Sequence, residues 1–171
     1  MRRLLTKWGL NEMSWRGDRG EYWFLAQAVL IVAFVLLPAY RPPGLNLPSA
    51  IAEYALWGVA GAIALVALIL IGKGLLDLGG NLTPLPYPTE NGELVQTGIY
   101  GIVRHPLYGG LILGAIAWSL VQLSLSHLLG VALLFAFLDA KSRREEVWLS
   151  EKYPEYFDYR QRVKKLIPLI Y

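Results

Sequence analysis

The chain has 171 residues, of which 55% are hydrophobic and only 17% are charged. Soluble domains are about 45–50% apolar and about 25% charged, so this composition excludes an ordinary soluble domain and indicates a single domain that lies mostly in lipid. The formal charge is +3, and the basic residues form no stripe, which argues against nucleic acid as a partner. The chain has no cysteine, which excludes disulfides, iron–sulfur clusters and a cysteine nucleophile.

Four apolar segments are expected to cross the membrane. Residues 22–40 and 54–72 contain no charged side chain, and each has about the 20 residues that one crossing of the hydrocarbon needs. A third uncharged run covers residues 106–138, which is too long for one crossing and has a polar patch near its middle. This run is therefore predicted to form two antiparallel helices, about 107–123 and 127–140, joined by a tight turn.

Small residues recur inside the third predicted span, where Gly110 and Gly114 form a GxxxG pair. Such a face lets two membrane helices approach closely, so a packing role is expected for it. Room for a lipid chain is the alternative.

The basic residues predict how the spans are oriented. Of the 16 Lys and Arg residues, 15 lie before the first span, between the second and third, or after the fourth, and only Arg41 lies on the other side. Because basic residues are enriched in cytoplasmic loops, both termini and the long second loop are predicted to face the cytoplasm. The first 20 residues lack the pattern of a secretory signal, and Leu4, Leu5 and Trp8 fit either an interfacial helix or a frayed basic tail.

Chemically capable side chains are concentrated at the end of the loop that covers residues 73–104. A loop of this length without secondary structure of its own is usually functional. It ends in the run Gly98-Ile-Tyr100-Gly-Ile-Val-Arg104-His105-Pro106-Leu-Tyr108. Pro106 suits the first turn of a helix, so Arg104 and His105 are expected at a helix N-terminus, where N–H groups and a guanidinium favour an anion. A basic membrane anchor is the alternative interpretation of Arg104 and His105.

A second polar cluster follows the fourth span, from Asp139 to Leu149, and is interpreted as a continuation of that helix into the cytoplasm. It contains Glu145 and Glu146, whose side chains diverge by about 100° on a helix and cannot both face one ligand atom. We expect one of them to bind a ligand while the other holds an arginine or a backbone donor. A salt-bridged helix surface is the alternative. Asp139 and Lys141 are expected to be interfacial residues.

Together the two clusters resemble the integral-membrane methyltransferases typified by isoprenylcysteine carboxyl methyltransferase, and they are similar to the phospholipid N-methyltransferases. The resemblance covers about residues 73–171. The run from Gly98 to Tyr108 matches the family's Gly-x-Tyr … Arg-His-Pro-x-Tyr signature. Glu145-Glu146-x-x-Leu149, followed by spaced tyrosines and a terminal Ile-Pro, matches its C-terminal signature. The chain departs from the family at Gly101 and Lys141, where arginine is common.

With the hydropathy pattern, the resemblance implies an all-α integral membrane protein of about four transmembrane helices. This fold has a C-terminal helical hairpin and a cytoplasmic cofactor pocket. The pocket would be built from the 73–106 loop and the C-terminal helix. Residues 1–72 would form an N-terminal tail and two transmembrane helices, and residues 73–171 the methyltransferase core. The implied activity is methyl transfer from S-adenosyl-L-methionine to a lipophilic or lipidated acceptor from the bilayer: an isoprenylcysteine carboxylate, a phospholipid amine or an isoprenoid lipid.

The resemblance also implies roles for particular residues. Those expected to bind the cofactor are Gly98, Tyr100, Arg104, His105, Pro106, Tyr108, Glu145 and Glu146. Of these, Arg104 and Glu146 are expected to be catalytic, with Arg104 and nearby N–H groups holding the cofactor's carboxylate. No metal site is expected, because the two histidines lie on opposite sides of the predicted membrane. An NADPH-dependent membrane reductase of the sterol-reductase type and a non-catalytic membrane scaffold stay open as alternatives.

Overall fold

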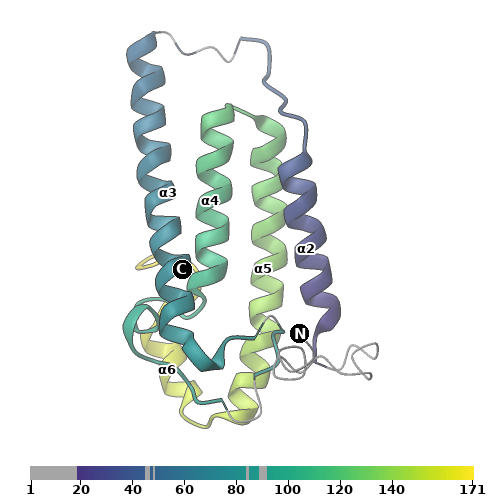
Figure 1. Ribbon diagram of the computed structural model, residues 1–171, viewed down its shortest axis with the longest axis vertical. Helices are drawn as coiled ribbons and strands as arrows, with labels where there is room; N and C mark the ends of the chain where they lie inside the picture. The colour runs from purple at the N-terminus through teal and green to yellow at the C-terminus, as the bar shows by residue number, and fades with distance from the viewer. Residues whose placement is uncertain (1–18, 45–46, 48, 84, 89–91) are drawn as a thin grey trace.

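The structure is a computed structural model that describes residues 19–44, 47, 49–83, 85–88 and 92–171. Within these residues the fold is a bundle of four long helices with a short fifth helix at one end (Figure 1). The long helices are α2 (Glu21–Leu36), α3 (Ala50–Leu78), α4 (Pro106–Gln122) and α5 (Leu125–Lys152). The expected interfacial helix at Leu4, Leu5 and Trp8 lies outside the described residues.

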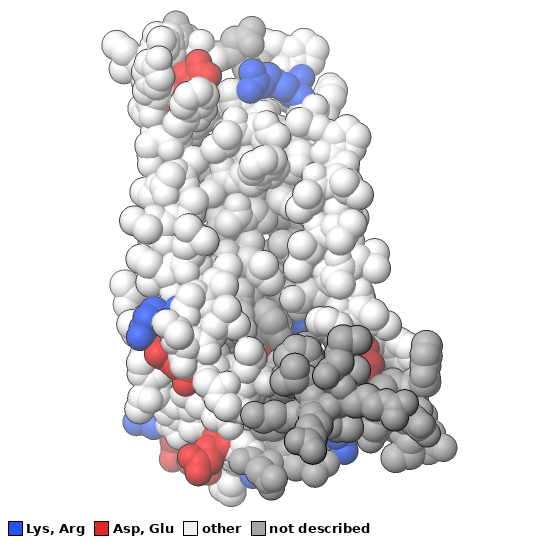
Figure 2. All heavy atoms as spheres, in the orientation of Figure 1, with Lys and Arg blue, Asp and Glu red and all other residues white. Residues whose placement is uncertain are grey.

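The four long helices correspond in order to the four predicted spans. By length and composition α3 and α5 could each cross a membrane, whereas α2 and α4 are apolar but have only 16 and 17 residues. α2 ends at Leu36 and not at residue 40, because Leu37 precedes a proline and is extended at ψ 126°. Figure 2 shows one face of the bundle, where uncharged side chains cover the middle and the charged ones gather at the two ends.

α4 and α5 form the predicted antiparallel hairpin. Leu123 ends α4 in the left-handed conformation, and the Ser124 hydroxyl caps α5 by accepting the backbone N–H of His127 at 3.3 Å. α5 then continues without a break to Lys152, as predicted for the second polar cluster. At 28 residues it is about 42 Å long, so its last turns extend beyond the predicted span at 127–140.

α3 and α4 pack closely through glycine. A Cβ on Gly110 would lie 2.5 Å from the Ile71 Cγ1 atom and 2.9 Å from the Ala67 carbonyl oxygen, both on α3. Gly74 of α3 is similarly close to Leu107 of α4, where a Cβ would lie 3.0 Å from the leucine side chain. This contact confirms the packing role expected for the small residues of the third span.

The loop between α3 and α4 is shorter than predicted, because the first residues of the expected 73–104 loop are helical. Leucines at positions 75, 76 and 78 are strong helix formers, and Lys73 pairs with Asp77 one turn later at 3.1 Å. The helix ends where Gly79 adopts φ 51°. The rest of the loop contains two 3-10 turns, η2 (Gly79–Asn81) and η3 (Gly98–Gly101).

The chain after α5 returns to the start of α4. The short helix α6 (Tyr156–Arg162) lies at the end of the bundle opposite the α4–α5 turn (Figure 1). Beyond it, the backbone N–H groups of Arg104 and His105 donate to the carbonyls of Lys164 and Lys165, at 2.8 Å and 2.9 Å. This C-terminal segment therefore fixes the backbone immediately before α4.

Candidate active site

A cavity of about 350 Å³ lies at this polar end of the bundle. Its volume is in the range of small-molecule sites, and its wall combines the α3–α4 loop, the start of α4, one face of α5 and the tyrosines around α6. Six of the eight predicted binding residues line it, namely Tyr100, Arg104, His105, Pro106, Tyr108 and Glu145. Gly98 and Glu146 are not part of the cavity wall.

Gly98 lies behind the cavity wall, and its backbone conformation forms the η3 turn. It adopts φ 61°, and a Cβ there would lie 2.2 Å from the Asp77 Oδ2 atom. The same carboxylate accepts the Ile99 backbone N–H at 2.8 Å, and this bond, with the charge of Lys73, lowers the pKa of Asp77. The turn brings Tyr100 onto the wall, where its hydroxyl donates to the Gly74 carbonyl at 3.3 Å. Gly98 thus acts on the cavity through Tyr100.

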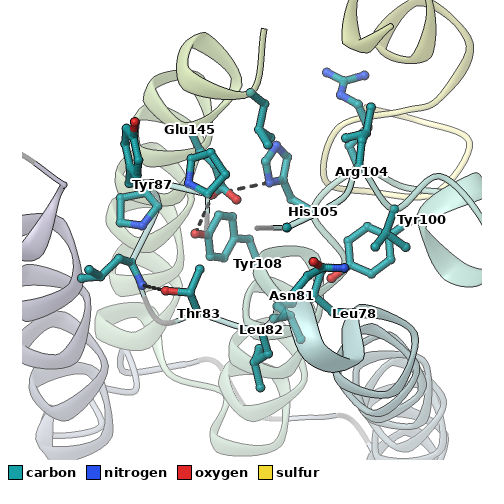
Figure 3. A pocket seen from close by; sticks show the side chains of 18 of the residues that line it. Leu78, Asn81, Leu82, Thr83, Tyr87, Tyr100, Arg104, His105, Tyr108 and Glu145 are labelled. Atoms are coloured by element: carbon teal, nitrogen blue, oxygen red, sulfur yellow. Dashed lines mark hydrogen bonds and ion pairs between the residues drawn. The ribbon is translucent and has the colours of Figure 1, made fainter. Parts of the chain in front are cut away.

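Arg104 and Glu146 form an ion pair that faces the C-terminal segment. The Nε and Nη2 atoms of Arg104 lie 3.0 Å and 2.9 Å from the Glu146 Oε1 atom. Its Nη1 atom donates to the carbonyls of Arg160, at 2.9 Å, and Val163. Every guanidinium nitrogen therefore has a protein partner, and in Figure 3 the guanidinium points away from the ring cluster around Tyr108.

Glu146 is held in its charged form. Burial opposes its ionisation, but the hydrogen bond from His105 and the charge of Arg104 outweigh burial and lower the pKa of Glu146 to about 2. An ionised carboxylate only accepts hydrogen bonds, so the His105 Nε2 atom, 3.1 Å from Glu146 Oε1, carries a proton. Glu146 thereby orients the imidazole from outside the cavity.

Glu145 takes the opposite position, on the cavity wall. The Tyr108 hydroxyl donates to its Oε2 atom at 2.9 Å, and the His105 Nδ1 atom lies 3.8 Å from the same oxygen (Figure 3). The His105 and Tyr108 rings are stacked, with centroids 5.5 Å apart and planes 7° from parallel. The two neighbouring carboxylates point apart, as their spacing on a helix predicted: Glu146 holds an arginine and Glu145 faces the cavity. The sequence left open which of the two would face a ligand, and Glu146, which was expected to be catalytic, lies behind the cavity wall.

Lys141 corrects one expectation, because it is a buried cavity residue and not an interfacial one. It is 1% exposed, its Nζ atom donates to the Gln27 Oε1 atom at 2.6 Å, and it lies 5.1 Å from the centroid of the Tyr108 ring. Its spacing of four residues from Glu145 places both on one face of α5. That spacing, with the isolated Gln27 in an apolar span, was a signal available in the sequence.

Three tyrosines near α6 also line the cavity. The C-terminal signature includes them as spaced tyrosines, but they were not among the residues expected to bind the cofactor. The Tyr159 hydroxyl donates to the Tyr100 carbonyl at 2.6 Å, which ties α6 to η3. The Tyr153 hydroxyl donates to the Gly92 carbonyl at 2.6 Å, which ties the end of α5 to the α3–α4 loop. Tyr156 is the third.

Long apolar helices, with charged side chains and a cavity of small-molecule size at one end of the bundle, are the features of a helical membrane protein. Within that class, the chain matches the model of the phospholipid methyltransferase family over residues 56–156. This match covers more than half of the chain, which therefore belongs to the phospholipid methyltransferase family. This is a family of membrane methyltransferases that use S-adenosylmethionine, although some of its members are named as resistance proteins. The match confirms the resemblance that the two motifs indicated.

The chain is similar to a metal resistance protein and to two methyltransferases. It is 31% identical to the nickel-cobalt-cadmium resistance protein NccN of Alcaligenes xylosoxydans xylosoxydans over 134 residues, which are 66% of this chain and 63% of that protein. It is 38% identical to protein-S-isoprenylcysteine O-methyltransferase of Saccharomyces cerevisiae over 79 residues, 45% of this chain and 33% of that protein. It is 26% identical to methanethiol S-methyltransferase of a Pseudomonas species over 178 residues, 98% of this chain and 66% of that protein. The chain thus spans less than two thirds of the length of its first relatives.

One relative bears on the reductase alternative. The chain is 39% identical to Delta(14)-sterol reductase TM7SF2 of Mus musculus over 90 residues. The aligned part is 49% of this chain but only 21% of that protein.

Proposed function

We propose that the protein transfers a methyl group from S-adenosyl-L-methionine to a lipophilic acceptor at the cytoplasmic face of the membrane. One observation carries the proposal. Two motifs about 40 residues apart in sequence meet at one cavity: Arg104-His105-Pro106 and Glu145-Glu146. They do so in a chain that belongs to a methyltransferase family. The acceptor is proposed to be lipophilic because the cavity adjoins α2, α4 and α5, whose outer surfaces are apolar.

We also propose that all four long helices cross the bilayer, with both termini and the cavity on the cytoplasmic side. The distribution of 15 basic residues against one supports this orientation. α2 and α4 are about 24–26 Å long, which approaches the roughly 30 Å of hydrocarbon, and the extended residues that follow α2 add length. In this arrangement residues 1–72 provide two spans, and residues 73–171 provide most of the cavity wall, to which Phe24 and Gln27 of α2 also contribute.

The residues of the wall fit the proposed cofactor, which has amino acid, ribose and adenine parts. Glu145 offers a carboxylate to a hydroxyl or ammonium group, and Tyr100 and Tyr108 offer apolar ring surface. S-adenosylmethionine, when bound, supplies an electrophilic methyl group on a sulfonium. The chain's own contribution is alignment and the exclusion of water, since an in-line displacement needs little covalent help.

The residues divide into those that contact ligands and those that position them. We assign Glu145 and His105 to the ligand side, with the His105 Nδ1 atom directed toward Glu145 and the Nε2 proton held by Glu146. We assign Arg104 and Glu146 to positioning, because their charges are paired with each other and with the C-terminal backbone. An amine, phenol or thiol acceptor would release its proton to Glu145 or His105, whereas a carboxylate acceptor is already ionised at neutral pH.

NADPH-dependent reduction is the second candidate function, favoured by the identity to the sterol reductase. A reductase would bind NADPH in place of the methyl donor. Cofactor binding therefore separates the two candidates directly.

The test is calorimetric titration of the detergent-solubilised protein with S-adenosylhomocysteine, with NADPH titrated in parallel. We expect saturable binding of S-adenosylhomocysteine and none of NADPH. Glu145→Gln is expected to weaken that binding about ten- to a hundredfold, because a hydrogen bond to a charged group is worth about 1.5–3 kcal/mol. Glu151→Gln, an exposed carboxylate on the same helix, is the matched control and should bind as wild type does.

Two outcomes contradict the proposal. Binding of NADPH alone would favour the reductase. Binding of neither compound by folded protein would favour a non-catalytic scaffold.

A further inference from the structure

Tyr156 differs from four other tyrosines of the cavity wall in its hydrogen bonding. The hydroxyls of Tyr100, Tyr108, Tyr153 and Tyr159 each donate to an oxygen of the protein. Tyr156 is 1% exposed, and its hydroxyl has no hydrogen-bond partner among the described residues. Burial of an unpartnered hydroxyl costs free energy, so packing alone would favour phenylalanine at this position.

The Tyr156 ring is held in place by its neighbours. It packs edge to face against Tyr159, with centroids 5.6 Å apart and planes at 71°. Its backbone N–H donates to the Tyr153 carbonyl at 3.0 Å. Tyr156 is therefore a fixed residue of the cavity wall, and its hydroxyl is buried within that wall.

The hydroxyl is available as a hydrogen-bond donor at neutral pH. Burial raises the pKa of Tyr156, and the nearby carboxylates of Glu146 and Glu145 raise it further. The phenol stays protonated, so the group that suits it is an accepting oxygen on a bound ligand.

The position of Tyr156 indicates which ligand supplies that oxygen. Tyr156 lies on α6 at the polar end of the cavity, next to Tyr159 and on the side of Arg104. Another part of the wall, with Phe24, Gln27 and Lys141, comes from α2 and α5 of the bundle. A lipophilic acceptor would enter from the bundle side, and a water-soluble cofactor from the side of α6.

We propose that the Tyr156 hydroxyl donates a hydrogen bond to an oxygen of the adenosyl cofactor, and that Tyr156 is a cofactor-binding residue. This inference rests on the proposed function. It assigns a binding role to a residue that the two sequence motifs leave without one. It also explains why a hydroxyl without a partner is kept in the wall.

The experiment compares Tyr156→Phe with Tyr159→Phe in two measurements: thermal unfolding without ligand, and calorimetric titration with S-adenosylhomocysteine. Tyr156→Phe removes an unpartnered hydroxyl, so the ligand-free variant should unfold at the wild-type temperature or above it. It should bind S-adenosylhomocysteine about three- to tenfold more weakly, the loss expected for one neutral hydrogen bond. Tyr159→Phe, the matched control, leaves the Tyr100 carbonyl without its donor and should unfold at a lower temperature.

The outcomes distinguish failure of this inference from failure of the proposed function. Equal affinity of wild type and Tyr156→Phe for S-adenosylhomocysteine overturns the inference and leaves the methyltransferase proposal standing. A lower unfolding temperature for ligand-free Tyr156→Phe also overturns it, because the hydroxyl would then have a partner in the free protein. If wild type does not bind S-adenosylhomocysteine, the proposed function fails and the inference fails with it.

Discussion

The apolar bundle and its polar end are held together by different kinds of contact. In the bundle, α3 and α4 meet through the small surface around Gly110, while apolar side chains such as Leu65 and Leu68 are more than half exposed on the outside. At the polar end, individual hydrogen bonds and ion pairs join residues far apart in sequence, as between Tyr159 and the Tyr100 carbonyl or between Arg104 and Glu146. The outer faces of the bundle should therefore tolerate substitution, whereas the polar end depends on each of a few contacts.

Gly109→Ala tests the place where the two regions meet, and we expect it to have the largest effect. A Cβ on Gly109 would lie 2.0 Å from the Leu166 carbonyl oxygen, so the C-terminal segment must move away. The expected loss of stability is about 3 kcal/mol, at the upper end for overpacking, with at least tenfold weaker binding of S-adenosylhomocysteine. Thermal unfolding in detergent and calorimetry measure the two effects.

Gly61→Ala is the matched control for this substitution. Among the described residues, no atom lies within 4 Å of the Cβ that it would add to α3, so the stability of the variant should equal or slightly exceed that of wild type. Equal effects of the two substitutions would show that close approach at Gly109 does not limit stability.

Glu146→Gln sharpens the comparison between the two neighbouring carboxylates. It removes the charge that accepts hydrogen bonds from Arg104 and His105, so we expect a loss of about 2 kcal/mol in stability. Its effect on cofactor affinity should be smaller than that of Glu145→Gln, which should leave stability nearly unchanged. The same two measurements on both variants test this crossed pattern, and a larger loss of affinity in Glu146→Gln would reverse our division of the pair.

The acid sensitivity of the wild-type protein should show the smallest effect. The pKa of Glu146 is lowered from 4.5 to about 2 in the folded protein, so its stabilisation is complete above pH 4.5. That stabilisation is lost as pH falls from about 4.5 through about 2, because the unfolded chain takes up the proton first. The unfolding temperature of wild type should fall more steeply across this window than that of Glu146→Gln. Parallel slopes would contradict the charged state assigned to Glu146.

Local patterns in the sequence predicted much of the bundle. The polar patch between Gln122 and His127 predicted the α4–α5 turn, because a hydrogen-bonding cap interrupts an apolar run that is too long for one span. The sequence predicts that the second span ends at residue 72, because the uncharged run stops at Lys73. In the structure Asp77, one turn later, pairs with it and the helix continues.

The candidate site was predictable only in part, because many of its contacts join residues that are far apart in the sequence. The two motifs supplied six residues of the cavity wall, and the angle between adjacent helical residues predicted that Glu145 and Glu146 would separate. The partners of Arg104 at Arg160 and Val163 are backbone carbonyls, which leave no mark in a sequence. The spacing of Lys141 from Glu145 and the polar Gln27 in an apolar span could each be seen in the sequence. No local pattern, however, pairs Lys141 with Gln27, 114 residues away.

The position of the last wall residues along the chain has a consequence for biosynthesis. Tyr153, Tyr156 and Tyr159, together with the carbonyls that hold Arg104 and His105, follow all four long helices in the sequence. Translation proceeds from the N-terminus at about 5–20 residues per second, so these helices leave the ribosome before the segment that closes the cavity. The nascent chain can assemble its apolar bundle first, and it gains a cavity able to hold a ligand only when that segment docks.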